Sequence, residues 1–323
     1  MEWVPLVSVV IPTRNRAGLV RRAVDSALCQ SYSNVEVIVV IDGPDGGTAE
    51  ALNAIDDGRL RVIELTESVG GAEARNTGVR ASTGEWIAFL DDDDEWLPEK
   101  IKKQAEAAVA RQNKDLIISC RYIARRGSED SICPRRMPND NERIDEYICC
   151  PKGYSQGEGF LQTSTFFVSR DLMSRVPFVS GLKRGQDFAW MIQACNEGGA
   201  TVYVHPEILS IFTAGEASPG VSRISANPNW RSLYAWIRNN KRLFTRRSYA
   251  YCMGNVILPD VMKCKEPVSV RLSLAADAFL NGSPRPKSLF IFCLRAFFPH
   301  SVINLLKRLQ AYAPAKRKAI VTA

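Results

Sequence analysis

Four consecutive aspartates, Asp91–Asp94, directly follow the apolar run WIAFL. Adjacent carboxylates raise one another's pKa unless a cation is present, so the cluster needs a positive partner. Hard oxygen ligands in an open arrangement suit Mg²⁺ or Mn²⁺, which commonly bridge protein carboxylates to a substrate's phosphates. The alternative is a solvated strand end in which one residue, Asp94, caps the next helix. Since one cap does not need four carboxylates, the cluster predicts a divalent-cation site that receives a diphosphate.

Two further side chains indicate that a nucleotide carries this diphosphate. Asp42 ends an apolar run before glycines, where a carboxylate can accept hydrogen bonds from ribose or base donors. Arg75, in the segment EARNTG, offers a planar fork to a phosphate or a base edge. The structural alternatives are an Asx turn for Asp42 and a surface salt bridge for Arg75. The sequence lacks G-x-G-x-x-G after its first apolar run and lacks G-x-x-x-x-G-K-[ST], which disfavours dinucleotide-binding and P-loop chemistry.

The elements that must position these residues alternate between strand and helix. Short β-branched runs predict buried strands, and helical spacing of apolar residues follows each of them. This alternation predicts βαβ units and a mostly parallel sheet with helices on both faces, in which ligands lie beyond the carboxyl ends of the strands. The strands are predicted at Leu6–Pro12, Val35–Asp42, Arg59–Leu65 and residues 84–90, so that Thr13–Asn15, Asp42 and Asp91–Asp94 follow the first, second and fourth of them.

The pattern loosens after a helix that starts at Leu97, with Pro98 in its first turn. Residues 125–158 are rich in charge, Pro and Gly, and predict a long irregular or lid-like region. A strand and helix at residues 164–176, a helix at 185–198 and a broken strand at 201–212 follow. From about Ala217 the chain is expected to be mainly helical, with breaks near Pro228, Pro259 and the segment NGSPRP.

Composition and charge fit a globular protein with two unlike parts. The chain has 323 residues, of which 46% are hydrophobic, and its nine cysteines are scattered without a C-x-x-C pair. Such cysteines predict reduced thiols, and the N-terminal segment predicts no signal peptide, so we expect a cytoplasmic protein. Residues 216–323 contain 18 Lys/Arg and 4 Asp/Glu, whereas residues 1–215 contain 24 Lys/Arg and 31 Asp/Glu. Residues 1–215, the acidic front, suit binding to cations, and the basic residues 216–323 suit binding to anionic surfaces.

The segments VSVVIPTRNR, VEVIVVIDGPDGGT, GGAEARNTGVRASTGEWIAFLDDDDEW and LKRGQDFAWMIQA resemble the successive signature blocks of family 2 inverting glycosyltransferases of the GT-A fold. The resemblance covers about residues 6–215. It implies a Rossmann-like GT-A catalytic domain at residues 1–215, and residues 216–323 are expected from their own composition to form a basic, mainly helical region. It also implies a nucleotide-sugar donor, with a UDP-sugar favoured and GDP- or dTDP-sugars as alternatives, a Mn²⁺ or Mg²⁺ cofactor, and a glycan or lipid-linked glycan acceptor.

The resemblance also assigns roles by position. Asp91 and Asp93 match the family's D-x-D motif, with Asp93 the main metal ligand, and Asp92 lies near the ribose. Asp187 matches the general base of an inverting displacement. Asp42 would contact the base of the nucleotide. The remaining nucleotide-binding residues would be Pro12, Thr13, Arg14, Asn15 and Arg75, and those on the acceptor side would be Trp190 and Gln186.

Two positions depart from the family's pattern. The usual acidic pair after the second strand is Ile41-Asp42 here, so one carboxylate remains. The usual Glu before the base is Gln186, which keeps hydrogen bonding but removes a like charge, so we expect the pKa of Asp187 to be raised less than in the usual pair. The displacement itself needs only one well-placed carboxylate, so neither change removes a required residue.

Other readings concern the tail and the class of protein. The segment Ser288–Lys318 is either a helix packed on the catalytic domain or an interfacial segment on an anionic membrane, which would make the protein peripheral on the inner face. A metal-dependent nucleotidyltransferase is the alternative enzyme, and a nucleic-acid-binding protein is less favoured because the acidic front would repel phosphate. His205 is expected to be structural, and Ser222 and Arg223 are weak candidates for diphosphate contact.

Overall fold

The computed structural model describes residues 4–127, 129–139, 142–152, 158–213, 229–284 and 292–293. The chain divides into two compact units, Met1–Asn227 and Pro228–Ala323. The boundary expected between residues 215 and 216 falls in a stretch, 214–228, that lies outside the described residues.

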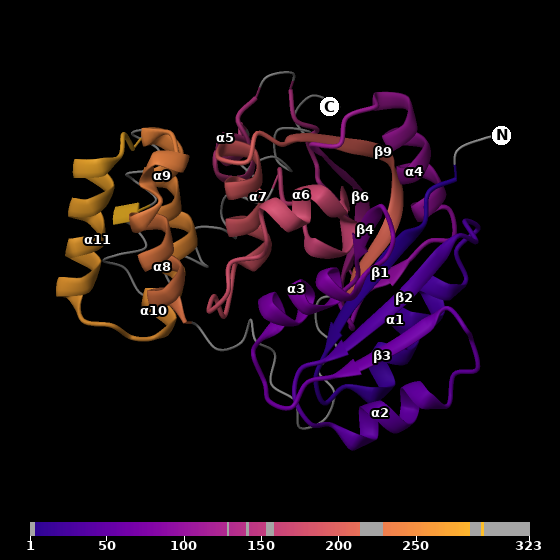
Figure 1. Ribbon diagram of the computed structural model, residues 1–323. Helices are drawn as coiled ribbons and strands as arrows, with labels where there is room; N and C mark the ends of the chain where they lie inside the picture. Colours follow the sequence, from indigo (N-terminus) through magenta and orange to yellow (C-terminus); the bar gives the residue numbers. More distant parts are fainter. Residues whose placement is uncertain are drawn as a thin grey trace, which may run out of the picture. The chain divides into compact units, whose positions relative to one another are not determined.

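The first unit is built on a nine-stranded sheet whose hydrogen-bonded order is β3-β2-β1-β4-β8-β6-β9-β5, with β7 paired to β6 (Figure 1). The neighbours β3, β2, β1 and β4 run parallel, which confirms the mostly parallel sheet expected from the alternation of elements. Strand β8 pairs antiparallel with β4 and β6, and β6 pairs parallel with β9. The strands are β1 Val7–Thr13, β2 Val35–Ile41, β3 Leu60–Glu64, β4 Trp86–Phe89, β5 Glu95–Trp96, β6 Leu116–Arg126, β7 Glu129–Cys133, β8 Phe167–Ser169 and β9 Thr201–Thr213.

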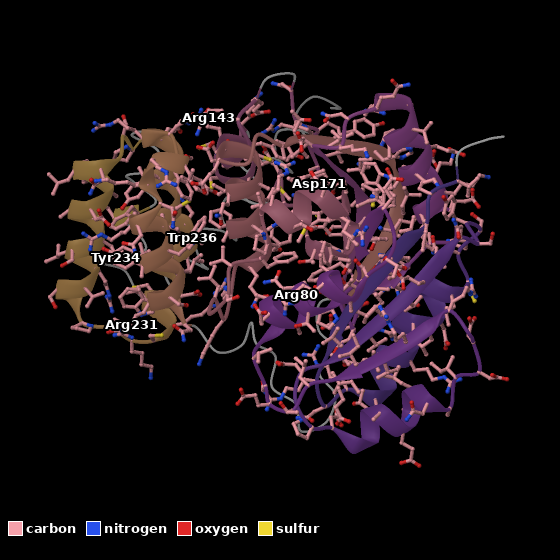
Figure 2. The ribbon with its side chains drawn as sticks, viewed as in Figure 1. Arg80, Arg143, Asp171, Arg231, Tyr234 and Trp236 are labelled. Carbon is pink, nitrogen blue, oxygen red and sulfur yellow. The ribbon has the colours of Figure 1, made fainter. Side chains whose placement is uncertain are left out.

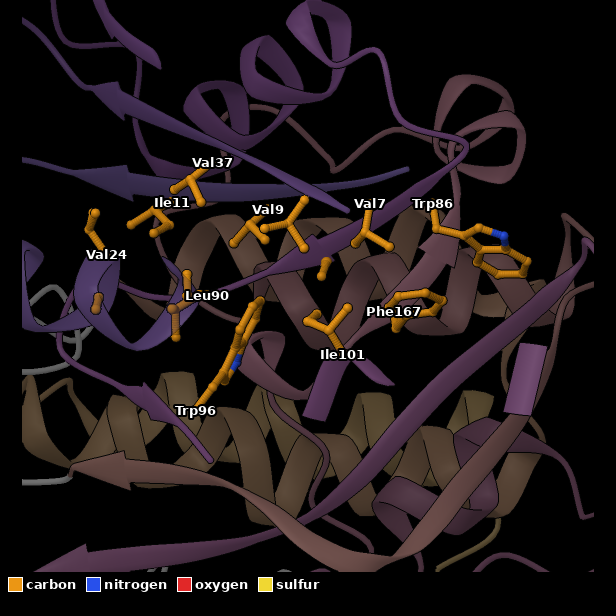
Figure 3. Close-up of a cluster of buried hydrophobic side chains, with 14 of the residues drawn as sticks. Val7, Val9, Ile11, Val24, Val37, Trp86, Leu90, Trp96, Ile101 and Phe167 are labelled. Carbon is orange, nitrogen blue, oxygen red and sulfur yellow. The ribbon is translucent and has the colours of Figure 1, made fainter. Parts of the chain in front are cut away.

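Helices cover both faces of the parallel part, as expected. Alternate residues of each strand point to opposite faces, so Val7, Val9 and Ile11 of β1 face one core while Ile38 and Val40 of β2 face another. The first core receives α1 Ala17–Leu28, α2 Gly46–Asn53 and α4 Lys100–Arg111, and Figure 3 shows it from within. The second receives α3 Gly71–Ala81.

Helix α3 packs very close to the sheet because it has a glycine at the contact. A Cβ built on Gly78 would lie 2.4 Å from Cγ1 of Val10 on β1, closer than two carbon atoms tolerate. Replacement of Gly78 by any larger residue would therefore push the helix away from the sheet. This close packing fixes the depth of Arg75, which is one turn earlier on the same helix and is buried.

The prediction of an irregular region at residues 125–158 is wrong in part, at residues 125–126, 129–133 and 144–149. Strand β6 continues to Arg126 and turns into β7, and α5 Ile144–Cys149 follows. The sequence pattern fails here because β6 is held by β7 along one edge and by β9 along the other, so backbone pairing extends it through polar residues. The helix predicted to start at Leu97 also starts later, since α4 begins at Lys100 and Pro98 lies before its first turn.

The end of the first unit follows the expected order. A short turn η1 Thr163–Thr165 and β8 lead into α6 Arg170–Arg175, and α7 Gln186–Asn196 precedes β9. The strand predicted to be broken is continuous over Thr201–Thr213, although its register against β6 shifts on both sides of Arg121.

The second unit is helical, as expected. Its elements are α8 Trp230–Asn239, η3 Lys241–Leu243, α9 Arg246–Cys252, η4 Met253–Ile257, α10 Leu258–Lys263 and α11 Val268–Asn281. The expected break at Pro259 is wrong: the chain stays helical through it, because the wide π-turn η4 precedes it and Pro259 occupies the first turn of α10. Within the described part of the chain, every helix is too short or too polar to cross a membrane.

Candidate active site

The four aspartates after β4 alternate in exposure along their turn. The side chains of Asp91 and Asp93 are 28% and 20% exposed, whereas Asp92 is 8% exposed and Asp94 is fully buried. The two accessible carboxylates are those of the D-x-D pair. The other two therefore serve the protein's own structure.

Asp92 is held from the end of β1 and from the start of α1. Its Oδ2 accepts a 2.8 Å hydrogen bond from the hydroxyl of Thr13, and its Oδ1 accepts a 2.8 Å bond from Arg16. The same Arg16 nitrogen lies 3.2 Å from Oδ2 of Asp93. Burial raises the pKa of Asp92 to about 6, which Arg16 opposes and the charge of Asp93 reinforces. Arg16 is thus an internal counter-ion of the aspartate turn.

Asp94 anchors the turn from beneath, and the expectation that it caps a helix is wrong. Its oxygens accept a 2.6 Å hydrogen bond from Ser164 Oγ and a 3.1 Å bond from the backbone N–H of Thr213. The Ser164 oxygen in turn accepts the N–H of Asp91 at 3.0 Å. Burial and the neighbouring carboxylates raise the pKa of Asp94 well above its usual range. The residue before α4 is Glu99, whose side chain makes no cap.

Arg75 connects the aspartate turn to the start of α7. One of its terminal nitrogens donates to Oδ1 of Asp91, and the other donates a 2.8 Å hydrogen bond to Oε1 of Gln186. The amide nitrogen of Gln186 donates to the carbonyl of Leu182 at 2.6 Å, so its orientation is determined by two partners. The guanidinium also lies 5.6 Å from the ring centre of Phe178. Residues that are 111 positions apart in the chain therefore meet at one site.

Asp187 lies next to this connection, in the first turn of α7. Its Oδ1 accepts a 2.8 Å hydrogen bond from the N–H of Phe188, and the helix dipole favours a negative charge there. Burial and the charge of Asp91 nevertheless raise the pKa of Asp187, while Arg75 opposes that rise. A carboxylate with a raised pKa is a stronger base than an ordinary aspartate.

The prediction that Trp190 lines the acceptor side is contradicted by its burial. Its side chain is 0% exposed and lies between the rings of Phe166 and Phe178. Its indole N–H donates a 2.8 Å hydrogen bond to the carbonyl of Val176, so its only polar atom is already paired. Trp190 therefore supports α7 from the core and has no surface to offer an acceptor.

The nucleotide-side candidates lie together at the ends of β1 and β2. Pro12 is buried within β1. Arg14 donates to Oγ of Ser68, and that hydroxyl donates a 3.0 Å bond to Asp42. Asn15 adopts a left-handed conformation with φ 54°, and its N–H donates to Asp45 at 2.6 Å.

Asp42 also has backbone partners. Its carboxylate accepts the N–H groups of Val69 and Gly70, at 2.6 and 3.1 Å, and so holds the loop before α3. Contact between Asp42 and a base stays a prediction.

The donor set fits a divalent cation that receives part of its coordination from a substrate. Among the described residues, no three His, Cys, Asp or Glu side chains converge as a complete metal cluster. Asp91 and Asp93 supply accessible carboxylate oxygens, and Mg²⁺ or Mn²⁺ sites of this kind are completed by phosphate oxygens and water.

Sequence reasoning missed two residues of the site, Arg16 and Ser164. Arg16 could have been found from charge complementarity, since it follows the end of β1 by a short turn and the acidic turn after β4 needs a positive partner. No pattern marked Ser164, which comes from a separate part of the chain. His205 lies near the start of β9, where its Nδ1 accepts the N–H of Glu207, and so plays a structural part. Ser222, Arg223 and the tail from Ser288 lie outside the described residues, apart from positions 292–293.

A mostly parallel sheet with a carboxylate turn at its edge is the architecture of the GT-A glycosyltransferases, which use nucleotide-sugar donors. The family model "Glycosyl transferase family 2" matches residues 8–170, about half of the chain. The chain therefore belongs to glycosyl transferase family 2 and is a glycosyltransferase.

Relatives support the same family. TuaG of Bacillus subtilis (strain 168), named for teichuronic acid biosynthesis, is 29% identical over 217 residues, which cover 65% of this chain and 80% of TuaG. The succinoglycan biosynthesis protein ExoO of Rhizobium meliloti (strain 1021) is 31% identical, with 69% of this chain and 64% of ExoO covered. The uncharacterized glycosyltransferase RT0329 of Rickettsia typhi (strain ATCC VR-144 / Wilmington) is 39% identical over 118 residues, so the chain spans 36% of its length.

Solved structures share the fold at low sequence identity. S. aureus TarS 1–349 in complex with UDP-GlcNAc has a TM-score of 0.55 and 19% identity, with 77% of this chain and 67% of that chain covered. The mannosyltransferase PcManGT from Pyrobaculum calidifontis, in complex with GDP-Man and Mn²⁺, has a TM-score of 0.54 and 20% identity, with 97% and 81% covered. These likenesses establish the GT-A fold.

Proposed function

We propose that the protein is an inverting, metal-dependent glycosyltransferase that moves a sugar from a nucleoside-diphosphate sugar to a hydroxyl of a glycan or lipid-linked glycan. The observation that carries this proposal is the pairing of Arg75 with both Asp91 and Gln186. It brings the start of α7, where Asp187 lies, to the carboxylate turn after β4. A base and a diphosphate-binding turn on neighbouring elements are what a single displacement requires.

Asp187 is the general base of this reaction. It removes the proton from the acceptor hydroxyl as the oxygen attacks the anomeric carbon, on the face opposite the diphosphate. Its raised pKa strengthens it for that step, provided that the pH stays high enough to keep it ionised. The bond to the diphosphate breaks as the new glycosidic bond forms, so the configuration at the anomeric carbon inverts.

The leaving diphosphate is bound at the aspartate turn. Asp93, with Asp91, would hold Mn²⁺ or Mg²⁺, and such a cation supplies neutralisation of the charge that grows on the leaving group. Arg75 has a terminal nitrogen on Asp91, from which it can turn to a phosphate oxygen, because its planar fork suits either anion. Asp92, whose two oxygens are engaged by Thr13 and Arg16, orients the turn. Pro12, Thr13, Arg14, Asn15 and Asp42 would line the nucleotide.

The donor and acceptor classes are extended from the comparisons. A UDP-sugar is the favoured donor, with GDP- and dTDP-sugars as alternatives, because TarS was solved with UDP-GlcNAc and PcManGT with GDP-Man. Relatives named for teichuronic acid and succinoglycan biosynthesis support a polysaccharide acceptor. We place the protein in the cytoplasm, with its basic C-terminal tail as a peripheral contact to the inner face of the membrane.

Donor binding tests this function directly. Thermal unfolding would be measured with UDP-, GDP- and dTDP-sugars, each with Mn²⁺ and with EDTA. A donor that binds only the folded state raises the melting temperature in proportion to the logarithm of its concentration over Kd. We expect the UDP-sugar to raise it only when Mn²⁺ is present, and a panel without any response would sink the proposal.

A matched pair of variants locates the binding site. Asp93→Ala should lose the response that depends on Mn²⁺. Asp171→Ala removes a carboxylate from α6 whose side chain is 67% exposed, outside the site, and should keep the full response.

A further inference from the structure

Helix α11 has an unusual concentration of exposed apolar side chains. Val268, Leu272 and Phe279 are 50%, 51% and 50% exposed, and Leu280 is 77% exposed. Positions i, i+4 and i+11 lie on one side of a helix, so the first three form a stripe along three turns. We call these three residues, together with the neighbouring Leu280, the α11 stripe. The large exposed apolar residues of the first unit, such as Val109 and Ile132, are scattered over different elements.

The rotation of α11 is fixed by the contacts of its opposite face. Leu274 and Ala278 are buried there. The carboxylate of Asp277 accepts hydrogen bonds from the hydroxyl of Tyr234 on α8 at 3.0 Å and from that of Tyr249 on α9 at 3.1 Å. Rotating α11 about its axis so as to bury the stripe would break this buried hydrogen-bond network. The helix is therefore apolar on two sides, and among residues 229–284 only one of these sides is packed against other elements.

Every acidic side chain of the described helical unit is turned inward. Residues 229–284 contain nine Lys/Arg and three Asp/Glu. The side chains of Asp260, Glu266 and Asp277 are 4%, 14% and 8% exposed. Glu266 accepts the indole N–H of Trp230 at 3.2 Å. The outward charge of this unit is therefore positive (Figure 2 labels Arg231 on α8, near Tyr234 and Trp236).

Basic residues bracket the α11 stripe at both ends. Lys263 and Lys265 are exposed just before the helix begins. At its other end, Lys241 donates a 3.2 Å hydrogen bond to Asn281, the last residue of α11, and Arg246 donates a 3.1 Å bond to the carbonyl of Gly282. The surface thus combines an apolar stripe with cations at either end.

We propose that the α11 stripe docks on an anionic lipid bilayer, with its apolar side chains in the headgroup region and the flanking basic residues on lipid phosphates. An interfacial helix gains affinity from buried apolar area together with attraction to anionic lipid, and this face offers both. A nucleic acid is a poorer match, because three of the four stripe residues are aliphatic and single-stranded bases stack on aromatic rings. The proposal uses residues other than the C-terminal tail and does not depend on the transfer chemistry.

Vesicle co-sedimentation of the full chain tests this surface. Phosphatidylcholine vesicles with and without phosphatidylglycerol would be compared, and we expect binding only to the anionic ones. The double variant Leu272→Ser/Phe279→Ser should weaken that binding roughly tenfold, since it removes two apolar contacts with the bilayer. Val109→Ser, a change at a 43% exposed site on α4, is the matched control and should bind as the wild type does.

Charge variants separate the electrostatic attraction to anionic lipid from the burial of apolar side chains in the bilayer. Lys241→Gln and Lys265→Gln should each weaken binding to anionic vesicles by about fivefold, as expected for one cation near a charged membrane. Lys102→Gln, on the exposed side of α4, should not. Binding that survives all changes on α11 would overturn the proposal and leave the membrane contact to the tail alone.

Two further outcomes would also overturn it. One is wild-type protein that fails to bind anionic vesicles. The other is a stripe variant that loses thermal stability without losing vesicle binding, which would mean that residues 294–323 of the chain itself cover α11. If the double variant does not fold, Leu280→Ser tests the stripe in its place, because this most exposed position can be changed with little effect on folding. Donor-induced thermal shifts without lipid report on the proposed transferase separately, so either proposal can fail alone.

Discussion

Arg16 donates a 2.8 Å hydrogen bond to Asp92 and thereby ties the start of α1 to the aspartate turn after β4. The two side chains are 16% and 8% exposed, so the pair is largely removed from solvent. Thr13 occupies the other oxygen of Asp92. This arrangement leaves Asp92 fully engaged by the protein and leaves Asp91 and Asp93 as the accessible carboxylates of the turn.

Arg16→Gln should destabilise the fold by about 3 kcal/mol, because removal of one partner leaves a buried charge uncompensated. The loss of stability should be no larger than this, since Thr13 still donates to Asp92. Urea unfolding would measure it. Arg21→Gln is the matched control on the same helix: its side chain is 48% exposed and pairs with Asp25 at 3.8 Å, so its loss should cost less than about 0.5 kcal/mol. Equal effects of the two changes would contradict the role of Arg16.

Asp187→Asn should lower kcat by about 10²–10⁴-fold, because the amide cannot accept the proton of the acceptor hydroxyl. Donor-induced stabilisation should persist, since the aspartate turn is unchanged. A purified variant with near-normal transfer would refute the assignment of the base. Asp171→Asn, at an exposed position of α6, should retain activity.

Gln186→Glu should move the acidic limb of the pH–rate profile to higher pH. A new carboxylate beside Asp187 adds a like charge, which raises the pKa of a base that burial has already raised, so protonation removes activity at a higher pH. The profile of kcat/KM against pH would measure the shift. Gln193→Glu, two turns further along α7, carries the same change away from the site and should leave the limb in place. An unmoved limb in Gln186→Glu would argue against Asp187 as the titrating base.

The parallel half of the fold could be predicted because its signals are local. The apolar runs of β1, β2 and β4 are buried on both faces, and a helix follows β1 and β2 directly and β4 after the short strand β5, so pattern and structure agree. Strand β6 could not be predicted in the same way. Its polar half is strand only because β7 and β9 pair with its two edges, which is information from distant parts of the chain.

The sequence predicted which residue types gather at the candidate site, but it did not predict which partners each of them has in the fold. Carboxylates at strand ends identified Asp42 and Asp91–Asp94, yet burial decided their separate tasks. Asp94 is a buried anchor because Ser164, 70 positions away, donates to it. Trp190 follows Asp187 by three positions, but the rings on either side of it put its side chain in the core. Neither fact has a signature in the local sequence.

Lys100 is a buried lysine that the chemistry of the site does not use. Its side chain is 0% exposed, and its Nζ donates a 2.7 Å hydrogen bond to Oε1 of Gln104 while lying 3.9 Å from the ring centre of Trp96. The amide of Gln104 donates to the carbonyls of Ile118 and Thr165, so its oxygen must face a donor. Lys100 thus completes a buried network that joins α4 to β6 and η1.

Lys100→Met should flatten the pH dependence of stability above neutral pH. Burial lowers the pKa of Lys100 from 10.5 to about 7, so between these values the unfolded chain binds more protons than the folded one. The free energy of unfolding therefore rises with pH across this window, by up to about 1.4 kcal/mol per unit. From pH 7 to about 8.5, below the range in which Cys120 titrates, the wild type should gain up to about 2 kcal/mol more than Lys100→Met in urea unfolding. Loss of the donor to Gln104 lowers the variant's free energy of unfolding equally at every pH. The comparison therefore uses the slope of the free energy of unfolding against pH. Lys102→Met, exposed on the same helix, should keep the wild-type slope, and equal slopes for all three proteins would show that Lys100 stays charged in the folded state.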